Sequence, residues 1–349
     1  MNEQSAMKAA LALAERGLGW VEPNPMVGCV LLRGGEAIGE GWHRVFGKLH
    51  AEREALADAR KRGHDPRGAT AVVTLEPCCH HGKQPPCTEA LVEAGVARVV
   101  VAMADPGEEA GGGAAVLRAA GIDVEIGLME AEARRLNRAW LKRAATGRPW
   151  VIAKWAQTLD GRVATATGDS KWISNAASRR AVHGLRGRVD AIVTGVGTVI
   201  ADDPRLTARG VEVRRVARRV VLDRSGRCPA DALLRQADEV DGRAIPAAEV
   251  TGGTPGALLD RLGAEGCTNV LIEAGPTLVG AMLADGLIDQ LDVHLAPKVL
   301  GDATALPAVH LPGGPVERIA DATTLTLESA TPIDGDICLR YLTRPDASP

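Results

Sequence analysis

The sequence predicts two consecutive α/β domains, and three observations support this. The chain has 349 residues, of which 46% are apolar. A chain of this length usually forms more than one domain, each with its own hydrophobic core. Short β-branched strands alternate with amphipathic helices along its length. The alternation breaks once, at the polar turn 146–149 (TGRP). We therefore expect one domain over residues 1–145 and a second over residues 149–349.

The first domain is expected to have three layers. Helices are expected near 4–16, 51–62, 88–94, 113–120 and 129–143, and strands near 26–32, 36–42, 69–75, 97–103 and 123–126. Because these strands are apolar nearly throughout, they indicate a sheet covered on both faces. The order of elements then gives an α/β/α domain.

The second domain repeats the α/β pattern. Strands are expected at 150–156, 191–194, 219–223, 269–273, 289–295 and 336–342, and helices near 175–186, 256–264 and 276–284. The polar, weakly patterned stretch 230–255 is expected to be a loop. Gly195 and Gly197 follow an apolar strand, but Ile200 stands where a Rossmann fingerprint needs glycine. The helix that opens at Gly275 is a better phosphate site, since its first N–H groups can bind an anion, although a simple strand-to-helix turn is the alternative.

Composition excludes several classes of protein. A net charge of −3 and the scarcity of aromatic residues do not fit a nucleic-acid surface. No apolar run approaches the 18 residues of a membrane span, and the N-terminus lacks the features of a signal peptide. Of the seven cysteines, Cys29, Cys267 and Cys338 lie in or beside apolar runs and are expected to be buried free thiols. We therefore expect a cytoplasmic, reduced protein.

A candidate zinc site stands in the first domain. His50 and Glu52 are followed by Pro77-Cys78 and by Cys87, a variant of the H-x-E…P-C-x-x-C signature of zinc nucleobase deaminases. Three protein ligands, His50, Cys78 and Cys87, leave one coordination position open for a water. Glu52 suits a proton shuttle between that water and a leaving amine, and it would be the catalytic residue.

Two alternatives concern the ligands themselves. Cys79 could replace Cys78, although the preceding proline favours Cys78. His80 or His81 could complete a structural zinc site, but Glu52 would then have no role. A further departure is that eight residues, 79–86, separate the two thiols, where the general signature has two.

The order of motifs resembles the bifunctional deaminase/reductase family of riboflavin biosynthesis. In the first domain the resemblance rests on residues 22–28 (EPNPMVG), 41–43 (GWH), 50–52 (HAE) and 74–87 (TLEPCCHHGKQPPC). In the second it rests on residues 154–162 (KWAQTLDGR), 170–174 (SKWIS), 202–209 (DDPRLTAR), 272–278 (IEAGPTL) and 296–301 (APKVLG). The match covers nearly the whole chain in order.

The resemblance implies a fold and two activities. It implies a cytidine-deaminase-like first domain that holds one Zn²⁺ and a dihydrofolate-reductase-like second domain that uses NADPH. The first step would be hydrolytic deamination of 2,5-diamino-6-(5-phosphoribosylamino)pyrimidin-4-one. The second would be reduction of the ribose of 5-amino-6-(5-phosphoribosylamino)uracil to a ribityl chain. The partners implied are these small molecules, with no nucleic acid and no membrane, and a homo-oligomer.

The resemblance also implies contact residues. Substrate contacts of the deaminase fall at Asn24, His43 and Lys83; a turn residue, a loop histidine and a surface lysine are the respective alternatives. Cofactor contacts fall at Ala156, Trp172, Thr198, Asp202, Gly275, Pro276, Thr277, Leu278, Val279, Gly280 and Ala281. Substrate contacts of the reductase fall at Ser170, Arg186, Leu206, Arg209 and Glu273. Guanidinium groups suit a phosphate, although each arginine alone would be read as a surface ion-pair residue.

This chain departs from the family pattern at a few positions. Gly107 and Glu108 replace an asparagine and a proline, which puts phosphoribosyl contacts there in question. Ala274 replaces a glycine near the cofactor. The alternatives are a chain with only one active half, a nucleic-acid base deaminase fused to an unrelated domain, and a non-catalytic zinc module. The intact ligand set with Glu52, and the missing Cys-x-x-Cys spacing, argue against the last two.

Overall fold

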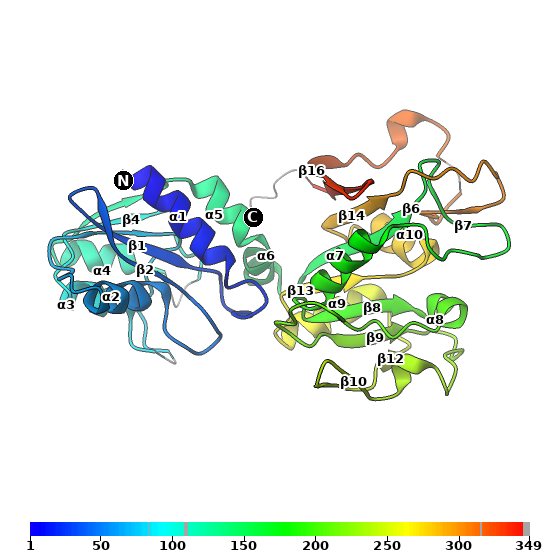
Figure 1. Cartoon of the computed structure of the whole chain (residues 1–349), viewed down its shortest axis with the longest axis horizontal. Helices are drawn as coiled ribbons and strands as arrows, with labels where there is room; N and C mark the ends of the chain where they lie inside the picture. Colours follow the sequence, from blue (N-terminus) through cyan, green and yellow to red (C-terminus); the bar gives the residue numbers. More distant parts are fainter. Residues whose placement is uncertain (83, 108–110, 315, 345–349) are drawn as a thin grey trace. The chain divides into compact units, whose positions relative to one another are not determined.

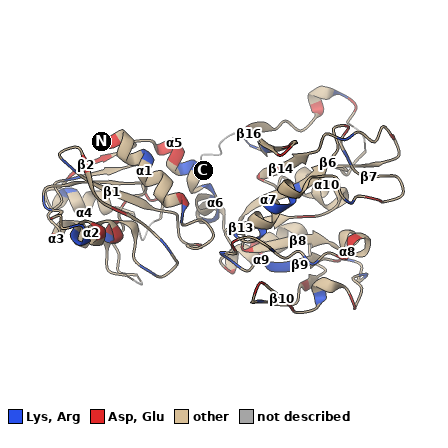
Figure 2. Ribbon diagram, viewed as in Figure 1, with Lys and Arg blue, Asp and Glu red and all other residues tan. Residues whose placement is uncertain are grey.

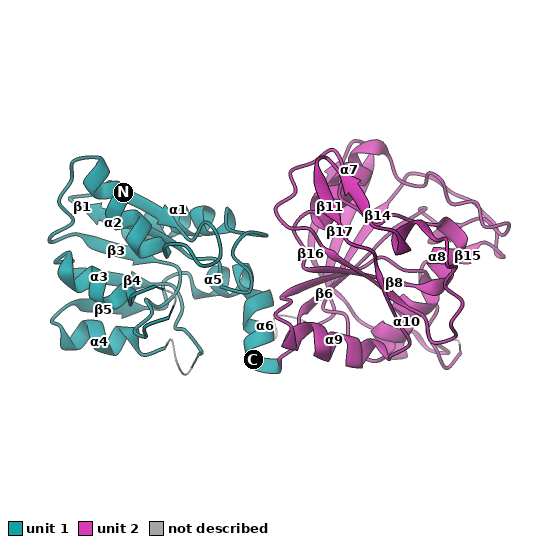
Figure 3. Ribbon diagram, turned by 90° about the horizontal axis from the view of Figure 1, so that it is seen from below, with its two compact units in different colours: residues 1–146 teal, residues 147–349 magenta. Residues whose placement is uncertain are grey.

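The computed structural model describes residues 1–82, 84–107, 111–314 and 316–344. Contacts divide the chain into two compact units, Met1–Thr146 and Gly147–Pro349, shown in teal and magenta in Figure 3. The division falls in the turn at which the helix–strand alternation breaks. Each unit has its own sheet and its own hydrophobic core.

The first unit is built on a five-stranded sheet in the order β2-β1-β3-β4-β5. Strand β1 is antiparallel to β2 and β3, whereas β3, β4 and β5 run parallel. The strands are β1 (Gly28–Arg33), β2 (Glu36–Trp42), β3 (Thr70–Val73), β4 (Arg98–Val101) and β5 (Asp123–Ile126). The helices are α1 (Glu3–Glu15), α2 (Ala51–Lys61), α3 (Cys87–Glu93), α4 (Gly113–Ala119), α5 (Glu130–Leu136) and α6 (Arg138–Thr146).

Helices cover both faces of this sheet (Figure 1). Met7 of α1 and Leu141 of α6 belong to the core on one face. Leu56 of α2, Leu91 of α3 and Leu117 of α4 belong to the core on the other. Because both sheet faces are buried, the strands carry apolar residues at successive positions. The predicted three-layer α/β/α fold is confirmed.

The single helix expected over 129–143 is wrong. The chain forms two helices there, α5 and α6, which are separated at Asn137. Asn137 is buried, and its side-chain amide accepts a hydrogen bond from the Met26 N–H (2.8 Å) and donates one to the Met26 carbonyl (2.9 Å). This contact joins residues far apart in the chain, so the apolar periodicity carries no sign of the break.

The second unit is built on an eight-stranded sheet in the order β12-β9-β8-β13-β6-β14-β17-β16. Only β17 runs antiparallel to its neighbours, β14 and β16. The strands of this sheet are β6 (Trp150–Gln157), β8 (Ala191–Gly195), β9 (Arg218–Leu222), β12 (Glu249–Thr251), β13 (Asn269–Ile272), β14 (Gln290–Leu295), β16 (Thr326–Ile333) and β17 (Asp336–Leu342). Two small sheets pair β7 (Arg162–Ala164) with β15 (Leu306–Pro307) and β10 (Asp238–Val240) with β11 (Arg243–Ile245).

Four α-helices accompany this sheet in the described residues: α7 (Ala176–Arg186), α8 (Val196–Asp202), α9 (Pro255–Ala264) and α10 (Pro276–Ala284). Leu185 of α7 packs with Ile152 and Leu271 on one face of the sheet. Helices α9 and α10 pack on the other face, where the largest apolar cluster of this unit lies. The α/β character expected for the second unit is confirmed, while α8 and β16 lie where no element was expected.

The loop expected over 230–255 is only partly a loop. It contains the β10–β11 hairpin and β12, which extends the main sheet by pairing parallel with β9. Arg219 explains how a polar stretch becomes ordered. This buried side chain donates to the carbonyl oxygens of Arg205 (2.8 Å), Gln236 (3.2 Å) and Pro246 (2.6 Å). These three long-range bonds satisfy backbone groups that the local sequence leaves unpaired.

Surface features agree with the composition. Basic and acidic residues are interspersed along both units in Figure 2. No helix in the described part of the chain has the length and apolarity needed to cross a membrane. All seven cysteines are free thiols; Cys29 and Cys267 are buried as expected, but Cys338 is only half-buried.

Candidate functional site

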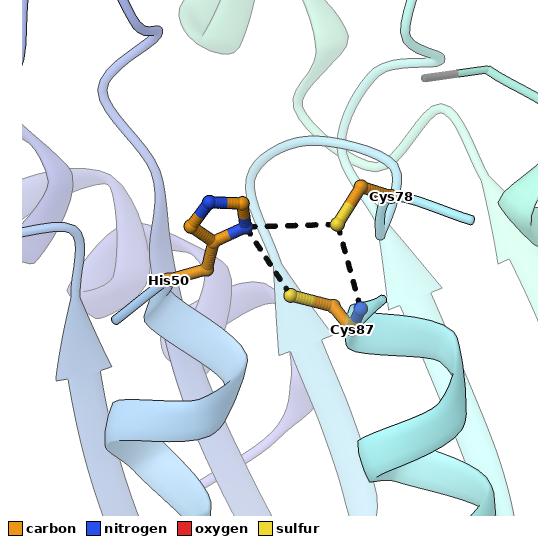
Figure 4. Close-up of side chains that lie close together, drawn as sticks. All are labelled: His50, Cys78 and Cys87. Carbon is orange, nitrogen blue, oxygen red and sulfur yellow. Dashed lines mark hydrogen bonds between the residues drawn. The ribbon is translucent and has the colours of Figure 1, made fainter. Parts of the chain in front are cut away.

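Three potential metal ligands converge in the first unit (Figure 4). His50 is the residue before α2, Cys87 is the first residue of α3, and Cys78 follows β3. The His50 Nδ1 lies 3.6 Å from the Cys78 Sγ and 3.4 Å from the Cys87 Sγ. All three ligand atoms lie within 4.8 Å of one another. Among the described residues this is the one such group of three.

The structure separates Cys78 from Cys79. The Cys79 thiol donates to the Gly111 carbonyl (3.2 Å), whereas the Cys78 sulfur faces His50 and Cys87. His80 and His81 are exposed, and the His81 Nε2 lies 3.7 Å from the Glu89 carboxylate. Neither histidine belongs to the ligand cluster, so a zinc ion held there would have three protein ligands and a fourth position for a water or substrate.

The donor set fits zinc. The Cys78 sulfur accepts hydrogen bonds from the Cys87 thiol and from His50, and together they lower the pKa of Cys78 to about 4. The Cys87 N–H also points at this sulfur (3.4 Å). The pKa of Cys87 is raised, because its proton is held in the hydrogen bond to Cys78 and because the thiol is buried. Two cysteine sulfurs, both deprotonated when metal binds, and an imidazole are the ligands that zinc prefers.

Glu52 lies beside this cluster in the first turn of α2. Its side chain is only 3% exposed, and its carboxyl group interacts with the Cys87 thiol. Burial raises the pKa of Glu52, and the negative charge of Cys78 raises it further. A buried carboxyl group whose pKa is raised is suited to take up and release protons during a reaction.

Asn24 and His43 lie next to the ligand cluster. The His43 ring is 5.3 Å from the His50 ring, centroid to centroid, and its Nε2 lies 3.3 Å from the Asn24 amide nitrogen. The His43 Nδ1 lies 3.0 Å from the Leu49 carbonyl, and burial lowers the pKa of His43. A neutral ring therefore donates through Nδ1 and accepts from Asn24 through Nε2. Lys83, the third expected substrate contact, lies outside the described residues.

Glu76 is a residue of this region that sequence reasoning missed. Its buried carboxylate accepts hydrogen bonds from the N–H groups of Asp105 (3.1 Å) and Ala114 (2.8 Å). These two residues stand on either side of the segment that contains Gly107 and Glu108. Gly107 donates its N–H to the Asp105 carboxylate (2.8 Å), while Glu108 lies outside the described residues. The available signal was an acidic residue between Leu75 and Pro77 in the motif before Cys78.

In the second unit, two of the expected cofactor positions, Thr198 and Gly275, meet beyond the ends of β8 and β13. The Thr198 hydroxyl accepts a hydrogen bond from the Gly275 N–H (2.9 Å), which joins the start of α8 to the residue that precedes α10. Ala156 lies on β6. Trp172 is 62% exposed and stacks under the Arg179 guanidinium (4.6 Å), and Asp202 lies 3.9 Å from the Lys171 ammonium.

The expected cofactor segment 275–281 is divided between surface and core. Gly275 to Leu278 are exposed or half-buried, whereas Val279 and Gly280 are buried. A Cβ at Gly280 would lie 1.9 Å from the His310 carbonyl oxygen, so this glycine is required by packing. The accessible start of α10, and not its second turn, is therefore the part that can meet a cofactor.

Three of the five expected substrate residues of the reductase meet near Thr207. Arg186 forms a two-pronged ion pair with Glu273 (2.6 and 2.9 Å) and donates to the Thr207 carbonyl (3.2 Å). Arg209 donates to the Thr207 hydroxyl (3.2 Å). Leu206 faces the core, so only its backbone can meet a ligand. Ser170 stands half-buried in the segment before α7.

The comparisons with known proteins agree with this architecture. Residues 149–339 match the family model "RibD C-terminal domain", and residues 1–103 match "Cytidine and deoxycytidylate deaminase zinc-binding region". The Escherichia coli riboflavin biosynthesis protein RibD is 42% identical, and the alignment covers 98% of this chain and 100% of that protein. The chain belongs to the RibD family.

Solved structures of RibD proteins carry the same fold. An Acinetobacter baumannii RibD is 40% identical, with a TM-score of 0.86 over 97% of this chain and 98% of that one. A Thermotoga maritima deaminase/reductase is 34% identical, with a TM-score of 0.87 over the same shares. The chain is therefore a bifunctional deaminase/reductase of riboflavin biosynthesis, with a zinc-binding deaminase unit and a reductase unit.

Proposed function

We propose that the first unit deaminates 2,5-diamino-6-(5-phosphoribosylamino)pyrimidin-4-one. We propose that the second unit uses NADPH to reduce the ribose of 5-amino-6-(5-phosphoribosylamino)uracil to a ribityl chain. The observation that carries the first step is the cluster of His50, Cys78 and Cys87 with Glu52 buried beside it. The Thermotoga maritima relative is a diaminohydroxyphosphoribosylaminopyrimidine deaminase and 5-amino-6-(5-phosphoribosylamino)uracil reductase, which supports both steps.

In the deaminase step, Glu52 moves the protons. A zinc ion held by His50, Cys78 and Cys87 would supply a water that is activated near neutral pH. Glu52 takes one proton from that water and gives it to the ring nitrogen as the hydroxyl group adds to the pyrimidine carbon. It then takes the proton of that hydroxyl group and gives it to the amine, so that a carbonyl forms, the carbon–nitrogen bond breaks and ammonia leaves. Asn24 and His43 orient the pyrimidine edge. Their amide and imidazole groups already contact each other. Lys83 is proposed to bind the phosphate.

In the reductase step, the chain's main task is orientation. NADPH, when bound, supplies the hydride. We propose that Ala156, Trp172, Thr198, Asp202 and the accessible start of the segment 275–281, residues 275–278, hold it, with the N–H groups at the start of α10 facing its phosphates. Ser170, Leu206, Arg186, Arg209 and Glu273 would hold the substrate. Arg209 is the better phosphate ligand of the two arginines, because the Arg186 guanidinium is already engaged by Glu273.

The decisive experiment separates the two steps. Glu52→Gln keeps the shape of the side chain but cannot carry a proton, so ammonia release should fall about 10²–10⁴-fold. Bound zinc and NADPH oxidation with the deaminated pyrimidine should stay at wild-type levels. Loss of both activities would contradict two independent sites. Absence of ammonia release from wild-type protein with zinc bound would remove the deaminase assignment and favour a chain with only its reductase half active.

The family resemblance also supports a cytoplasmic homo-oligomer that acts on small molecules. Light scattering of the purified chain tests the oligomer, and a single monomer mass would contradict it.

A further inference from the structure

The sheet face beneath α7 changes from apolar to polar along its strands. Near the strand starts, Ile152, Ile192 and Leu271 pack against Leu185 of α7. Two residues further along, on the same face, each strand carries a polar side chain. Asp292 pairs with Lys154, and Glu273 follows Ile272, which pairs with both Ala153 and Val193. One polar row therefore crosses four neighbouring strands: Thr194, Glu273, Lys154 and Asp292.

On β8 and β13 this row lies at the carboxyl ends of the strands, where open α/β sheets bind ligands, and on β6 and β14 it lies at mid-strand. The carboxylates in it are compensated: Glu273 by Arg186, and Asp292 by a two-pronged bond from Arg340 (2.9 and 3.1 Å). Lys154 stands between the two carboxylates. The charges of the row are thus accounted for within the described residues.

Two neutral polar atoms around this row are buried without a hydrogen-bond partner in the described chain. They are the Thr194 Oγ1 and the His294 Nδ1. Thr194 is fully buried and His294 is 4% exposed. His294 lies two residues beyond Asp292 on β14 and so on the same face, opposite Ala156 on β6 and Cys338 on β17. Thr194 stands on the Glu273 side of Lys154, and His294 stands on the Asp292 side.

Buried polar groups in folded proteins nearly always have hydrogen-bond partners. A group without one loses its hydrogen bonds to water on burial and gains none in exchange, which costs free energy. The chemistry of this pair indicates what the partner is. Burial and the charge of Lys154 lower the pKa of His294 to about 4, so the ring is neutral and offers one N–H and one lone pair. A threonine hydroxyl also donates and accepts. Two neutral groups of this kind match hydroxyl groups, whereas a phosphate would call for cations.

We propose that Thr194 and His294 are two further substrate contacts of the reductase, each hydrogen-bonded to a hydroxyl group of the opened sugar chain. The sugar would then lie along the row formed by Glu273 and Lys154, with the hydride-accepting carbon near Ala156. This inference rests on the proposed reduction of a ribose and names the residues that recognise its hydroxyl groups.

The test uses Thr194→Val and His294→Phe in the full-length protein. Each should lower kcat/KM for the deaminated pyrimidine about 10-fold, the effect of one lost hydrogen bond to a neutral group. The NADPH dissociation constant and ammonia release should not change. The midpoint of urea unfolding at pH 8 should stay the same or rise, since an unmet buried polar atom is removed.

Thr268→Val is the matched control. The Thr268 Oγ1 is likewise buried without a partner in the described residues, but it lies at the opposite end of β13. This change should leave kcat/KM as it is. Values of kcat/KM within twofold of wild type in both test variants, or an equal loss in Thr268→Val, would overturn the inference. A parallel weakening of NADPH binding would assign the two groups to the cofactor and would also overturn it.

Binding of ribitol 5-phosphate, measured by calorimetry, separates this inference from the proposed function. If wild-type protein does not oxidise NADPH with the deaminated pyrimidine, the proposed reductase step fails. The inference would still be supported if ribitol 5-phosphate binds to wild type and binds about 10-fold more weakly to either test variant. It would be overturned if the polyol phosphate does not bind to wild type, or binds to all variants equally.

Discussion

The ligand atoms of His50, Cys78 and Cys87 lie within 4.8 Å of one another in the first unit, each with its reactive atom turned inward. In the second unit, Arg186 and Glu273 are hydrogen-bonded to each other. These two groups, which are proposed to hold substrate, therefore already use each other as hydrogen-bond partners. The two sites therefore differ in the free-energy cost of binding. The metal cluster needs only to lose protons, whereas the reductase must exchange internal hydrogen bonds for bonds to its substrate.

The largest expected effect tests the claim that the metal cluster is preformed. Cys87→Ser should abolish zinc binding and lower ammonia release by more than about 10³-fold, since the activated water depends on the metal. Zinc content by mass spectrometry and ammonia release are the measurements. Cys79→Ser is the control: its thiol faces the Gly111 carbonyl, so zinc and activity should both remain. Zinc loss in the Cys79 variant alone would reverse the ligand assignment.

A second change tests how strongly the internal ion pair holds the reductase unit. Glu273→Gln leaves the buried Arg186 guanidinium without its carboxylate, so the free energy of unfolding should fall by about 4 kcal/mol. Urea unfolding at pH 7 measures this. Glu265→Gln, in the exposed pairs with Arg218 and Arg261, should cost less than about 1 kcal/mol. Equal effects would mean that the interior pair is no more important than a surface pair.

The third prediction concerns pH. The pKa of His294 is lowered to about 4 by burial and by Lys154, against about 6.5 in an unfolded chain. Between these values the unfolded chain binds a proton that the folded chain does not. The contribution of His294 is therefore complete above pH 6.5 and declines by roughly 3 kcal/mol as pH falls to 4.

Urea unfolding at several pH values checks this. His294→Phe should flatten the decline, whereas His310→Phe, at an exposed position of the same unit, should leave it as it is. If the two variants show the same slope as wild type, His294 is not the titrating group.

The smallest effect concerns the contact between α8 and the start of α10. Thr198→Val removes the oxygen that accepts the Gly275 N–H and should weaken NADPH binding about fivefold, an effect of about 1 kcal/mol. Fluorescence titration with NADPH measures the dissociation constant. Thr198→Ser keeps the hydroxyl and should bind as wild type does. If the serine variant is equally weak, the methyl group and not the hydrogen bond positions the segment.

The sequence predicted the metal cluster because its ligands lie in short motifs at the starts of two helices and the end of a strand. The preceding proline favoured Cys78 over Cys79, and the direction of each sulfur then separates the two. The three-layer unit was predictable for a similar reason, because periodicity reports burial of local elements.

Features that depend on distant contacts were not predictable. The break at Asn137, the ordering of 230–255 by Arg219 and the role of Glu76 each rest on a polar side chain that bonds to the backbone of another segment. Thr194 and His294 looked like ordinary members of apolar strands, and only the register showed that both flank Lys154 and Glu273. A polar residue inside an apolar element was the common signal in these cases.

The hydrogen bonds between Asn137 and Met26 also determine how short a functional fragment of the first unit can be. The match to the zinc-binding family model ends at residue 103, which suggests a short, separable module. Met26 stands two residues after Asn24, however, and its backbone is held by a side chain from the junction of α5 and α6. A fragment that stopped at residue 103 would contain all three metal ligands. It would lack the Asn137 side chain, which holds the Met26 backbone close to Asn24. The smallest independent deaminase is therefore expected to extend to the end of α6, and the closing helices serve as part of its binding apparatus as well as its cover.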